Sequence, residues 1–391
     1  MNDCTMTESS GGGRDRTREL NNDGARLDEL DRISMSLSIS QQAFSYLRGK
    51  TVMVTGVCGT IGRQLASQLL HNFEVKTLIG LDNNESELAT LEDSYGGRFN
   101  ARFLLGDVRE FGTIARSSRN VDVLFHAAAY KHVYLCERSP LEAIQTNVVG
   151  VQNIIQATID NRVERLIFTS SDKAVNPTNV MGTSKLMGER LITAASTDPN
   201  QTGAVFLSTR FGNVLGSRGS VIPIFISQIR RGGPVTLTDP NMTRFIMSLD
   251  DAVRLVIESV VNGQPGDVLI TKMEAIRIVD LAEIMIRECA PLCGRRAEDI
   301  EIRIIGQKPG EKLYEELMNE EEIRRSLELE QYFVVRPALA SGAKDLSIYQ
   351  GLVSSAITQP YNSANAVPMA RDDLAAFLDK NGLIRNEAAL P

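Results

Sequence analysis

The sequence is poor in the residues that build disulfide frameworks and metal centres. Its 391 residues include five cysteines and three histidines. An odd number of cysteines in a chain of this length argues against a disulfide framework and favours a reducing compartment. Cys289 and Cys293 stand four residues apart, but no second cysteine pair accompanies them. We therefore expect buried thiols and no metal site.

Excess basic charge and long apolar runs are also missing. Lysine and arginine together number 42 against 49 aspartates and glutamates, which gives a formal net charge of -7. This balance offers no electrostatic case for binding nucleic acid. No apolar run approaches the roughly 20 residues of a membrane span, and the polar N-terminus is unlike a signal peptide. We expect a cytoplasmic protein with no membrane span.

Apolar, β-rich segments alternate with helical ones from residue 48 onward. We expect strands at 51–55, 75–81, 101–105, 121–126, 166–170 and 205–210, and helices such as 61–70, 85–93 and 141–161. Such alternation predicts an α/β protein with a Rossmann-type, doubly wound parallel sheet. A ligand of this fold lies at the carboxyl ends of the strands.

The chain divides into four expected parts. Residues 1–47 are predicted to form a mobile tail and, from residue 26, a leading amphipathic helix. Residues 48–210 are expected to form the NAD-binding domain. Residues 211–335 should form mainly a smaller substrate-binding lobe, with some segments returning to the Rossmann core. Residues 336–391 are a C-terminal extension with a helix at 371–378.

A glycine-rich loop follows the first expected strand. Its glycines, Gly56, Gly59 and Gly62, have the spacing G-x-x-G-x-x-G and open a helix. Small residues let the backbone approach a pyrophosphate, and a helix N-terminus supplies unpaired N–H donors. We therefore expect a dinucleotide site that includes Thr55, Gly56, Gly59, Thr60, Ile61 and Gly62. A purely structural turn is the alternative.

Carboxylates at later strand ends extend this prediction. Asp82 stands about 20 residues beyond the last glycine, where a carboxylate accepts hydrogen bonds from a ribose diol and repels a 2′-phosphate. The cofactor is therefore expected to be NAD, with NADP as the alternative. Asp107 and Val108 are candidates to flank the adenine, or else an ordinary helix cap. The run Ala127, Ala128 and Ala129 either passes beneath the dinucleotide or serves packing alone.

Several motifs occur in a fixed order. They are the glycine loop, Ala-Ala-Ala-Tyr-Lys-His-Val at 127–133, Ser-Asp-Lys-Ala-Val-Asn-Pro-Thr-Asn-Val-Met-Gly-Thr-Ser-Lys at 171–185, Arg-Phe-Gly-Asn-Val at 210–214, Met-Thr-Arg-Phe at 242–245 and Lys-Pro-Gly-Glu-Lys-Leu at 308–313. Over about residues 48–335 the chain resembles an extended short-chain dehydrogenase/reductase. It is most similar to the UDP-N-acetylglucosamine 4,6-dehydratases of the polysaccharide-biosynthesis (CapD-like) family.

The resemblance implies an internal redox cycle on a UDP-sugar. NAD takes hydride from C4, the C5 proton and the C6 hydroxyl leave, and hydride returns to C6. The product is a UDP-4-keto-6-deoxy-N-acetylhexosamine with retained C5 configuration. By similarity Lys173 is the C5 base, Asp172 is the acid and Lys185 holds the nicotinamide ribose. These roles require a raised pKa for Asp172 and a lowered one for Lys173, unless the pair shares a proton.

Resemblance also implies the substrate contacts. The family positions near the sugar nucleotide correspond to Lys131, Asn147, Asn213 and Arg244, and residues 216–220 look like a flexible substrate loop. The alternative to a substrate contact for Arg244 is a surface salt bridge. A homo-oligomer is expected.

Three positions depart from the family pattern. Met181 stands where a tyrosine usually accepts the 4-hydroxyl proton, and a thioether cannot do so. Ser171 replaces threonine and Tyr134 replaces proline. Either the oxidoreductase is inactive, or the proton moves through Asp172, Ser171 or an ordered water. The competing functions are a UDP-hexosamine 4-epimerase, which needs no C5 base, and a non-catalytic subunit that binds NAD or a nucleotide sugar.

Overall fold

The computed structural model describes residues 41–384 except 98, 199–202, 218–219, 308–309 and 339–344. Residues from Gln42 onward belong to one compact unit. The expected tail and most of the expected leading helix lie outside the described residues, and the described helix α2 covers Gln41–Leu47. Within the described ranges, no helix has the length and apolar character to cross a membrane.

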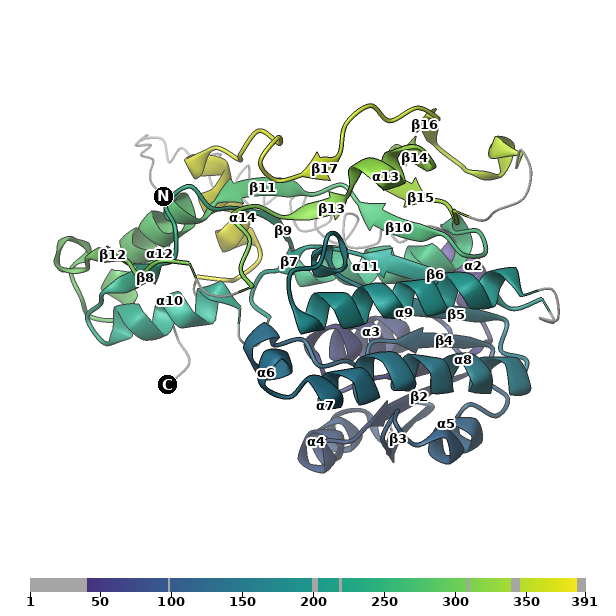
Figure 1. Ribbon diagram of the computed structural model, residues 1–391. Helices are drawn as coiled ribbons and strands as arrows, with labels where there is room; N and C mark the ends of the chain where they lie inside the picture. The colour runs from purple at the N-terminus through teal and green to yellow at the C-terminus, as the bar shows by residue number, and fades with distance from the viewer. Residues whose placement is uncertain are drawn as a thin grey trace, which may run out of the picture. The chain divides into compact units, whose positions relative to one another are not determined.

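A ten-stranded sheet forms the centre of the unit (Figure 1), with the strand order β16-β14-β15-β10-β6-β5-β4-β1-β2-β3. The seven strands from β10 to β3 are parallel to one another. Their order from the β3 edge is 3-2-1-4-5-6-10, and the first six strands have the order of the predicted Rossmann-type fold, which is thereby confirmed. The seven are β1 Thr51–Thr55, β2 Thr77–Asp82, β3 Ala101–Leu105, β4 Val123–His126, β5 Arg165–Thr169, β6 Val205–Arg210 and β10 Val268–Thr271.

Helices cover both faces of the sheet. Figure 1 shows α8 and α9 in front of the strands and α3 and α11 behind them. The inner strands are buried on both faces, as their nearly continuous apolar sequences predict. The helices are α3 Thr60–Asn72, α4 Glu85–Tyr95, α5 Phe111–Ser117, α6 Val133–Arg138, α7 Pro140–Ile144, α8 Gly150–Asp160, α9 Val180–Thr197 and α11 Leu249–Asn262.

The expected helical stretch over 141–161 is confirmed, but it is not a uniform α-helix. Between α7 and α8 the segment Gln145–Val149 forms a π-helical turn. Such a turn holds one extra residue, which the apolar spacing of the sequence does not reveal. Inside it, the buried Asn147 side chain accepts from the Tyr130 N–H at 2.8 Å and donates to the Tyr130 carbonyl and Ser184 Oγ, both at 2.9 Å. The turn therefore ties the loop after β4 to helix α9.

A second core lies beside the sheet, on the left of Figure 1. It contains a sheet of order β11-β9-β7, the pair β12-β8 and three helices. The bounds are β7 Asn213–Val214, β8 Val235–Leu237, β9 Thr243–Met247, β11 Glu274–Arg277, β12 Ile302–Ile304, α10 Val221–Arg230, α12 Ile278–Leu292 and α14 Arg371–Lys380. Helix α14 agrees with the expected terminal helix.

The later segments join both parts of the unit. Strands β14 Ser326–Leu329, β15 Tyr332–Val335 and β16 Leu352–Ser354 extend the main sheet in antiparallel fashion, after the short helix α13 Glu320–Ile323. Strand β17 Tyr361–Asn362 pairs with β13 Glu316–Met318. The segment before α14 therefore lies against the chain that follows the Lys308–Leu313 motif.

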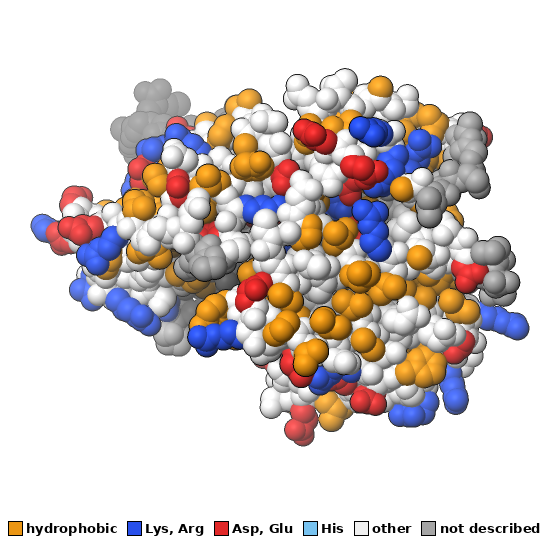
Figure 2. All heavy atoms as spheres, viewed as in Figure 1, with side chains coloured by type: hydrophobic (Ala, Val, Ile, Leu, Met, Phe, Trp, Pro, Cys, Tyr) orange, Lys and Arg blue, Asp and Glu red, His pale blue; other side chains and the backbone are white. Residues whose placement is uncertain are grey.

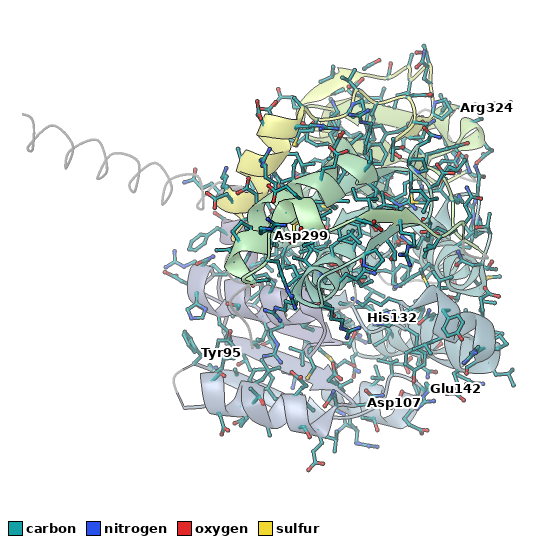
Figure 3. All side chains as sticks on the ribbon, turned by 90° about the vertical axis from the view of Figure 1, so that its left-hand side faces the viewer. Tyr95, Asp107, His132, Glu142, Asp299 and Arg324 are labelled. Atoms are coloured by element: carbon teal, nitrogen blue, oxygen red, sulfur yellow. The ribbon has the colours of Figure 1, made fainter. Side chains whose placement is uncertain are left out.

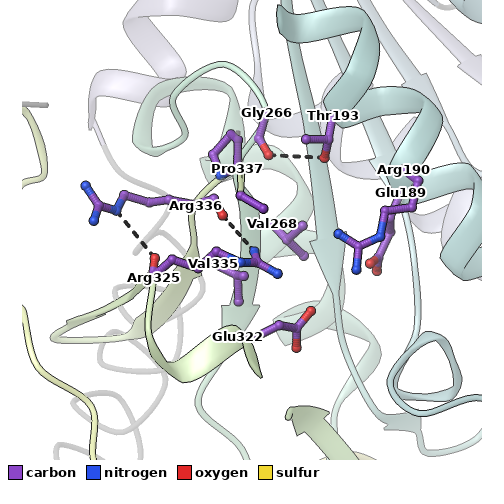
Figure 4. A pocket seen from close by; sticks show the side chains of 11 residues that line it. Glu189, Arg190, Thr193, Gly266, Val268, Glu322, Arg325, Val335, Arg336 and Pro337 are labelled. Carbon is purple, nitrogen blue, oxygen red and sulfur yellow. Dashed lines mark hydrogen bonds between the residues drawn. The ribbon is translucent and has the colours of Figure 1, made fainter. Parts of the chain in front are cut away.

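A buried ion-pair network anchors helix α9. Arg210, at the end of β6, is 1% exposed and donates to both oxygens of Glu189 on α9, at 3.0 and 2.6 Å. It also donates twice to Glu322 of α13, at 3.0 Å each. Figure 4 shows Glu189 and Glu322 in the same small cleft, which Thr193 and Gly266 also line. The network connects the helix that carries Lys185 with the chain after β13.

This network yields a stability prediction. Arg210→Met should lower the free energy of unfolding by about 3–5 kcal/mol, because the buried Glu189 and Glu322 carboxylates lose the guanidinium that bonds to both of them. Urea unfolding at neutral pH measures the change. Arg296→Met, which removes an exposed arginine paired with Asp299 at 2.7 Å, is the control and should have little effect. An Arg210→Met variant as stable as that control would contradict the assignment.

Candidate active site

The parallel strands bring their carboxyl ends to one edge of the sheet. Thr55 of β1 is in register with Leu81 of β2 and His126 of β4, and His126 is in register with Phe168 of β5. The loops that carry the predicted site residues therefore begin side by side. This is the edge at which doubly wound sheets bind ligands.

The glycine loop is packed too tightly for side chains. Gly56 has φ +70°, and a Cβ there would lie 2.6 Å from the backbone of Ala128. A Cβ on Gly62 would lie 2.1 Å from the Gly56 carbonyl oxygen. Gly59 is the N-cap of α3 and provides no side-chain cap, so the first-turn N–H groups are open to a ligand. An anionic group such as a pyrophosphate fits this position.

Asp82 lies beside the loop at the end of β2. One carboxylate oxygen accepts the Cys58 N–H at 2.9 Å and the other accepts the Asn84 N–H at 3.0 Å. Two backbone bonds hold the group in place, and each oxygen retains a lone pair for a further donor. The geometry fits recognition of a ribose diol.

Asp107 is bound by an arginine that the sequence analysis overlooked. Arg109 donates to it through Nε at 3.0 Å and Nη2 at 2.7 Å. Burial alone would raise the pKa of Asp107, but these hydrogen bonds outweigh it and lower that pKa. Arg109 also donates to Glu142 at 2.8 Å, and Figure 3 labels both carboxylates. Val108 next to them is buried against Gly150.

Lys185 reaches the sheet edge from within the protein. Its Nζ donates to the Thr169 carbonyl at 2.9 Å and lies 4.7 Å from the centre of the Phe168 ring. Burial lowers the pKa of Lys185 to about 8, although the charge of Glu189 opposes this shift. Burial, with a smaller contribution from Lys185, also lowers the pKa of His126 to about 3, so this histidine is neutral.

Met181 packs within the protein. Its side chain is 3% exposed and contacts a small apolar cluster with Cys136 and Ala143. It lies one helical turn before Lys185, as the sequence predicts. The methionine therefore fills space where a phenol would otherwise stand, and no proton acceptor replaces it on this helix turn.

Directly after β5, the buried Asp172 forms an ion pair with Lys173, whose side chain is one third exposed. Lys173 Nζ donates to the two Asp172 oxygens at 2.9 and 3.1 Å, and Ser171 Oγ donates to one of them at 2.6 Å. Burial would raise the pKa of Asp172, but the charge of Lys173 and the Ser171 hydrogen bond lower it. Burial would lower the pKa of Lys173, but the charges of Asp172 and Glu315 raise it.

These directions are opposite to those that the sequence analysis required. A carboxyl that donates a proton near neutral pH needs a raised pKa, and an amine that accepts a proton there needs a lowered pKa. The expectation considered each group alone, whereas mutual attraction in a buried pair favours both charged forms. A proton shared within the pair, the other possibility considered, agrees with the hydrogen-bond geometry.

Glu315 is a third ionisable group at this place, and the sequence analysis missed it. It accepts from Asn213 Nδ2 at 2.7 Å and from the Phe245 N–H at 3.0 Å, and its Oε1 lies 4.0 Å from Lys173 Nζ. Burial, followed by the charge of Asp172, raises the pKa of Glu315 to about 7. Its nearest sequence signal is the Lys308–Leu313 motif, which ends two residues earlier.

Asn213 and Arg244 meet at this carboxylate. Arg244 Nε lies 3.4 Å from Glu315, and its other nitrogens donate to the carbonyls of Thr243, Lys312 and Leu313. The interpretation of Arg244 as a surface salt bridge is therefore wrong, because the guanidinium is largely buried and bound on several sides. Lys131 is exposed in the loop after β4. Of the expected loop at 216–220, Arg218 and Gly219 lie outside the described residues.

Among the residues that the structure describes, no cluster of three or more histidine, cysteine, aspartate or glutamate side chains could hold a metal ion. Cys58, Cys136, Cys289 and Cys293 are free thiols, three of them buried.

Comparison with known proteins places the chain in a family. The polysaccharide biosynthesis protein family matches residues 52–337. The chain belongs to this family, and its fold is the Rossmann-type α/β fold described above. An X-ray structure of Pen from Bacillus thuringiensis is 37% identical, covers 86% of this chain and 99% of that one, and has a TM-score of 0.80.

Three curated relatives illustrate the range of names in this family. An uncharacterized membrane protein, MJ1061 of Methanocaldococcus jannaschii, is 49% identical over 79% of this chain and 92% of its own length. The capsular polysaccharide biosynthesis protein CapD of Staphylococcus aureus is 41% identical over 71% of this chain, which spans 46% of CapD. A UDP-glucose 4-epimerase of Rickettsia felis is 35% identical over 84% of this chain and 95% of that protein.

The glycine loop provides a prediction with an internal control. Gly49 has φ +72° with no atom near its Cβ position, whereas Gly56 has nearly the same φ and contacts Ala128. Gly49→Ala should therefore cost only the left-handed backbone penalty, about 1–2 kcal/mol. Gly56→Ala should destabilise the protein by more, because the loop or the Ala127–Ala128 segment must move. Equal unfolding free energies for the two variants would show that the close approach is unimportant.

Proposed function

We propose that the protein is a nucleotide-sugar 4,6-dehydratase that acts on UDP-N-acetylglucosamine and uses NAD. The observation that carries the proposal is the ion pair between the buried Asp172 and Lys173 at the sheet edge, directly after β5. An acid and a base held 2.9 Å apart suit the removal of water across C5 and C6. The product is a UDP-4-keto-6-deoxy-N-acetylhexosamine, with C5 configuration retained.

The described residues fit a dinucleotide. The pyrophosphate would lie against Gly56, Gly59 and the first turn of α3, and the Asp82 carboxylate would bind the ribose diol. The Asp82 carboxylate favours NAD over NADP, because it accepts hydrogen bonds from a free diol and repels a 2′-phosphate. The nearby Arg63, which could otherwise bind that phosphate, is already paired with Glu87. Lys185 would hold the nicotinamide ribose with its buried cation. When bound, the nicotinamide supplies the acceptor for the C4 hydride and the donor that returns it to C6.

The ion pair reaches its working protonation state by one internal transfer. If the proton of Lys173 Nζ moves along its hydrogen bond to Asp172, the pair becomes a neutral amine and a carboxylic acid. Lys173 then removes the C5 proton, and Asp172 protonates the departing 6-hydroxyl. Ser171 keeps the carboxyl aligned throughout. Desolvation of the pair by the bound sugar favours the uncharged form, because burial penalises both charges.

We expect the other predicted substrate contacts around the same pair. Asn213 and Arg244 line the lobe side of the Asp172–Lys173 pair, and Lys131 lies in the loop after β4. Asn147 acts by fixing that loop, since its amide is fully engaged with Tyr130 and Ser184. The sugar nucleotide would therefore be held between β9 and the β4 loop.

Self-association is also part of the proposal. Figure 2 shows hydrophobic side chains gathered on the face formed by α8 and α9. Among the strongly exposed apolar residues are Leu141 and Ile144 of α7 and Met187 of α9, at 71, 43 and 48%. Such a contiguous apolar surface favours a homo-oligomer.

The epimerase is the second candidate, because a relative of 35% identity carries that name. An epimerase oxidises and reduces C4 without removing the C5 proton, so it has no use for a base in the position of Lys173.

Incubation with UDP-N-acetylglucosamine and NAD, followed by NMR and mass analysis, tests the proposal. Loss of water with a 4-keto group supports it, and the C4 epimer alone contradicts it. If the sugar nucleotide is bound but unchanged, the protein is a non-catalytic binding subunit.

Lys173→Ala should abolish dehydration while cofactor binding persists, because Lys173 lies outside the glycine loop. The expected loss in turnover is about 100- to 10,000-fold, as is usual for a general base. Lys272→Ala is a matched control: Lys272 is 32% exposed and paired with Glu328, much as Lys173 is 33% exposed and paired with Asp172. Near-normal turnover of Lys173→Ala would remove this lysine from the mechanism.

A further inference from the structure

The Asp172–Lys173 pair is one proton site short for the proposed reaction. In the ion pair the two groups together hold one proton, on either nitrogen or oxygen. If Asp172 also accepted the 4-hydroxyl proton, the pair would hold two, and Lys173 would have no free lone pair for the C5 proton. An enzyme with tyrosine at this point stores the proton on the phenol, but Met181 has no such group. Another acceptor is needed.

Glu315 is in the right place for that acceptor. Its Oε1 lies 4.0 Å from Lys173 Nζ, and the same nitrogen donates to both Asp172 oxygens. The charged groups that face it are Asp172 and Lys173 from the turn after β5 and Arg244 from β9. Asn213 and the Phe245 N–H hold the carboxyl with two further bonds. The carboxyl is 5% exposed and lies next to the Asp172–Lys173 pair.

We infer that Glu315 stores the 4-hydroxyl proton during each turnover, with Asp172 as the relay. This assignment rests on the proposed oxidation at C4 and gives the catalytic centre the site that Met181 cannot provide. Burial raises the pKa of Glu315 to about 7, so the carboxylate and the acid are both accessible near neutral pH. A proton store requires this balance.

The cycle closes when its protons are counted. As hydride leaves C4, the 4-hydroxyl O–H bond breaks, its proton goes to Asp172, and Asp172 passes a proton to the Glu315 carboxylate. Lys173 then gives its own proton to Asp172. The neutral amine takes the C5 proton, the C5 electron pair forms the C5–C6 double bond, and the 6-hydroxyl leaves with the Asp172 proton as water.

The return steps restore the starting state. Hydride adds to C6, and the Lys173 ammonium returns its proton to C5. Glu315 then passes its stored proton through Asp172 to Lys173. The sugar has lost one water, and the three side chains again hold one proton. No other oxidant or co-reactant is required.

Glu315→Gln tests the store directly. The amide keeps the shape and hydrogen-bonding capacity but cannot take up a proton, so turnover should fall by about 100- to 10,000-fold with little change in KM. In the parent enzyme kcat should rise with pH through about 7, the pKa of Glu315, because the reaction starts from its carboxylate. This rise should be absent in Glu315→Gln. Glu315→Asp should restore part of the turnover and part of the rise in kcat with pH.

Glu316→Gln is the matched control. Glu316 is the adjacent carboxylate and pairs with Lys312 at 3.2 Å instead of Asp172. It should retain activity and the pH dependence of the parent protein. Near-parent turnover of Glu315→Gln with an unchanged pH profile would overturn the inference.

A second readout needs no substrate or cofactor. A carboxyl with its pKa raised from 4.5 to about 7 binds more protons in the folded than in the unfolded state between these values. Its contribution to stability therefore falls as pH rises through that window. The thermal midpoint of the parent should decline relative to Glu315→Gln over this range, and Glu316→Gln should follow the parent.

The two readouts separate the inference from the proposed function. A constant gap between parent and Glu315→Gln across that window would overturn the inference whatever the sugar chemistry. A parent enzyme that only epimerises C4 would refute the dehydratase. Because an epimerase also removes the 4-hydroxyl proton, the Glu315→Gln comparison would still decide the role of this carboxyl.

Discussion

The ion pair between the buried Asp172 and the partly exposed Lys173, at the carboxyl end of β5, is the interaction on which the rest of the site depends. Two charges taken out of water are expensive unless their hydrogen bonds are satisfied. Ser171 provides one such bond, and Glu315 and Arg244 complete the surrounding charges. The result is a compact group of acids and bases at the sheet edge that also carries the glycine loop, and in the proposed mechanism this group exchanges protons with the sugar.

The C-terminal extension completes this arrangement. Ser363 lies just after β17; its Oγ accepts the Glu315 N–H, and its N–H donates to the Glu315 carbonyl, at 2.9 and 2.8 Å. Its hydroxyl also contacts that of Thr243, the residue before Arg244. A segment with no recognisable motif therefore holds the backbone of a site residue. The expected division at residue 336 assigns no such role to the extension, and the domain boundaries remain a prediction.

The fold and the cofactor loop could be predicted because their signals are local. Alternating strands and helices define the sheet, and Gly56 and Gly62 follow from the sharp turn that a dinucleotide loop requires. Asp172, Lys173 and Lys185 could be named because they lie within one short motif. Glu315 could not, since its contact with Asp172 spans more than a hundred residues and depends on how β13 docks. The protonation of the pair could not be predicted either, because it follows from distances that a sequence does not contain.

The central claim is an internal redox cycle in which one hydride leaves C4 and arrives at C6 of the same sugar. The direct measurement uses UDP-N-acetylglucosamine labelled with deuterium at C4 and locates the label in the product by NMR. The account predicts deuterium in the C6 methyl group of a 4-keto sugar. Deuterium found again at C4, or product formed without transfer to C6, would contradict it.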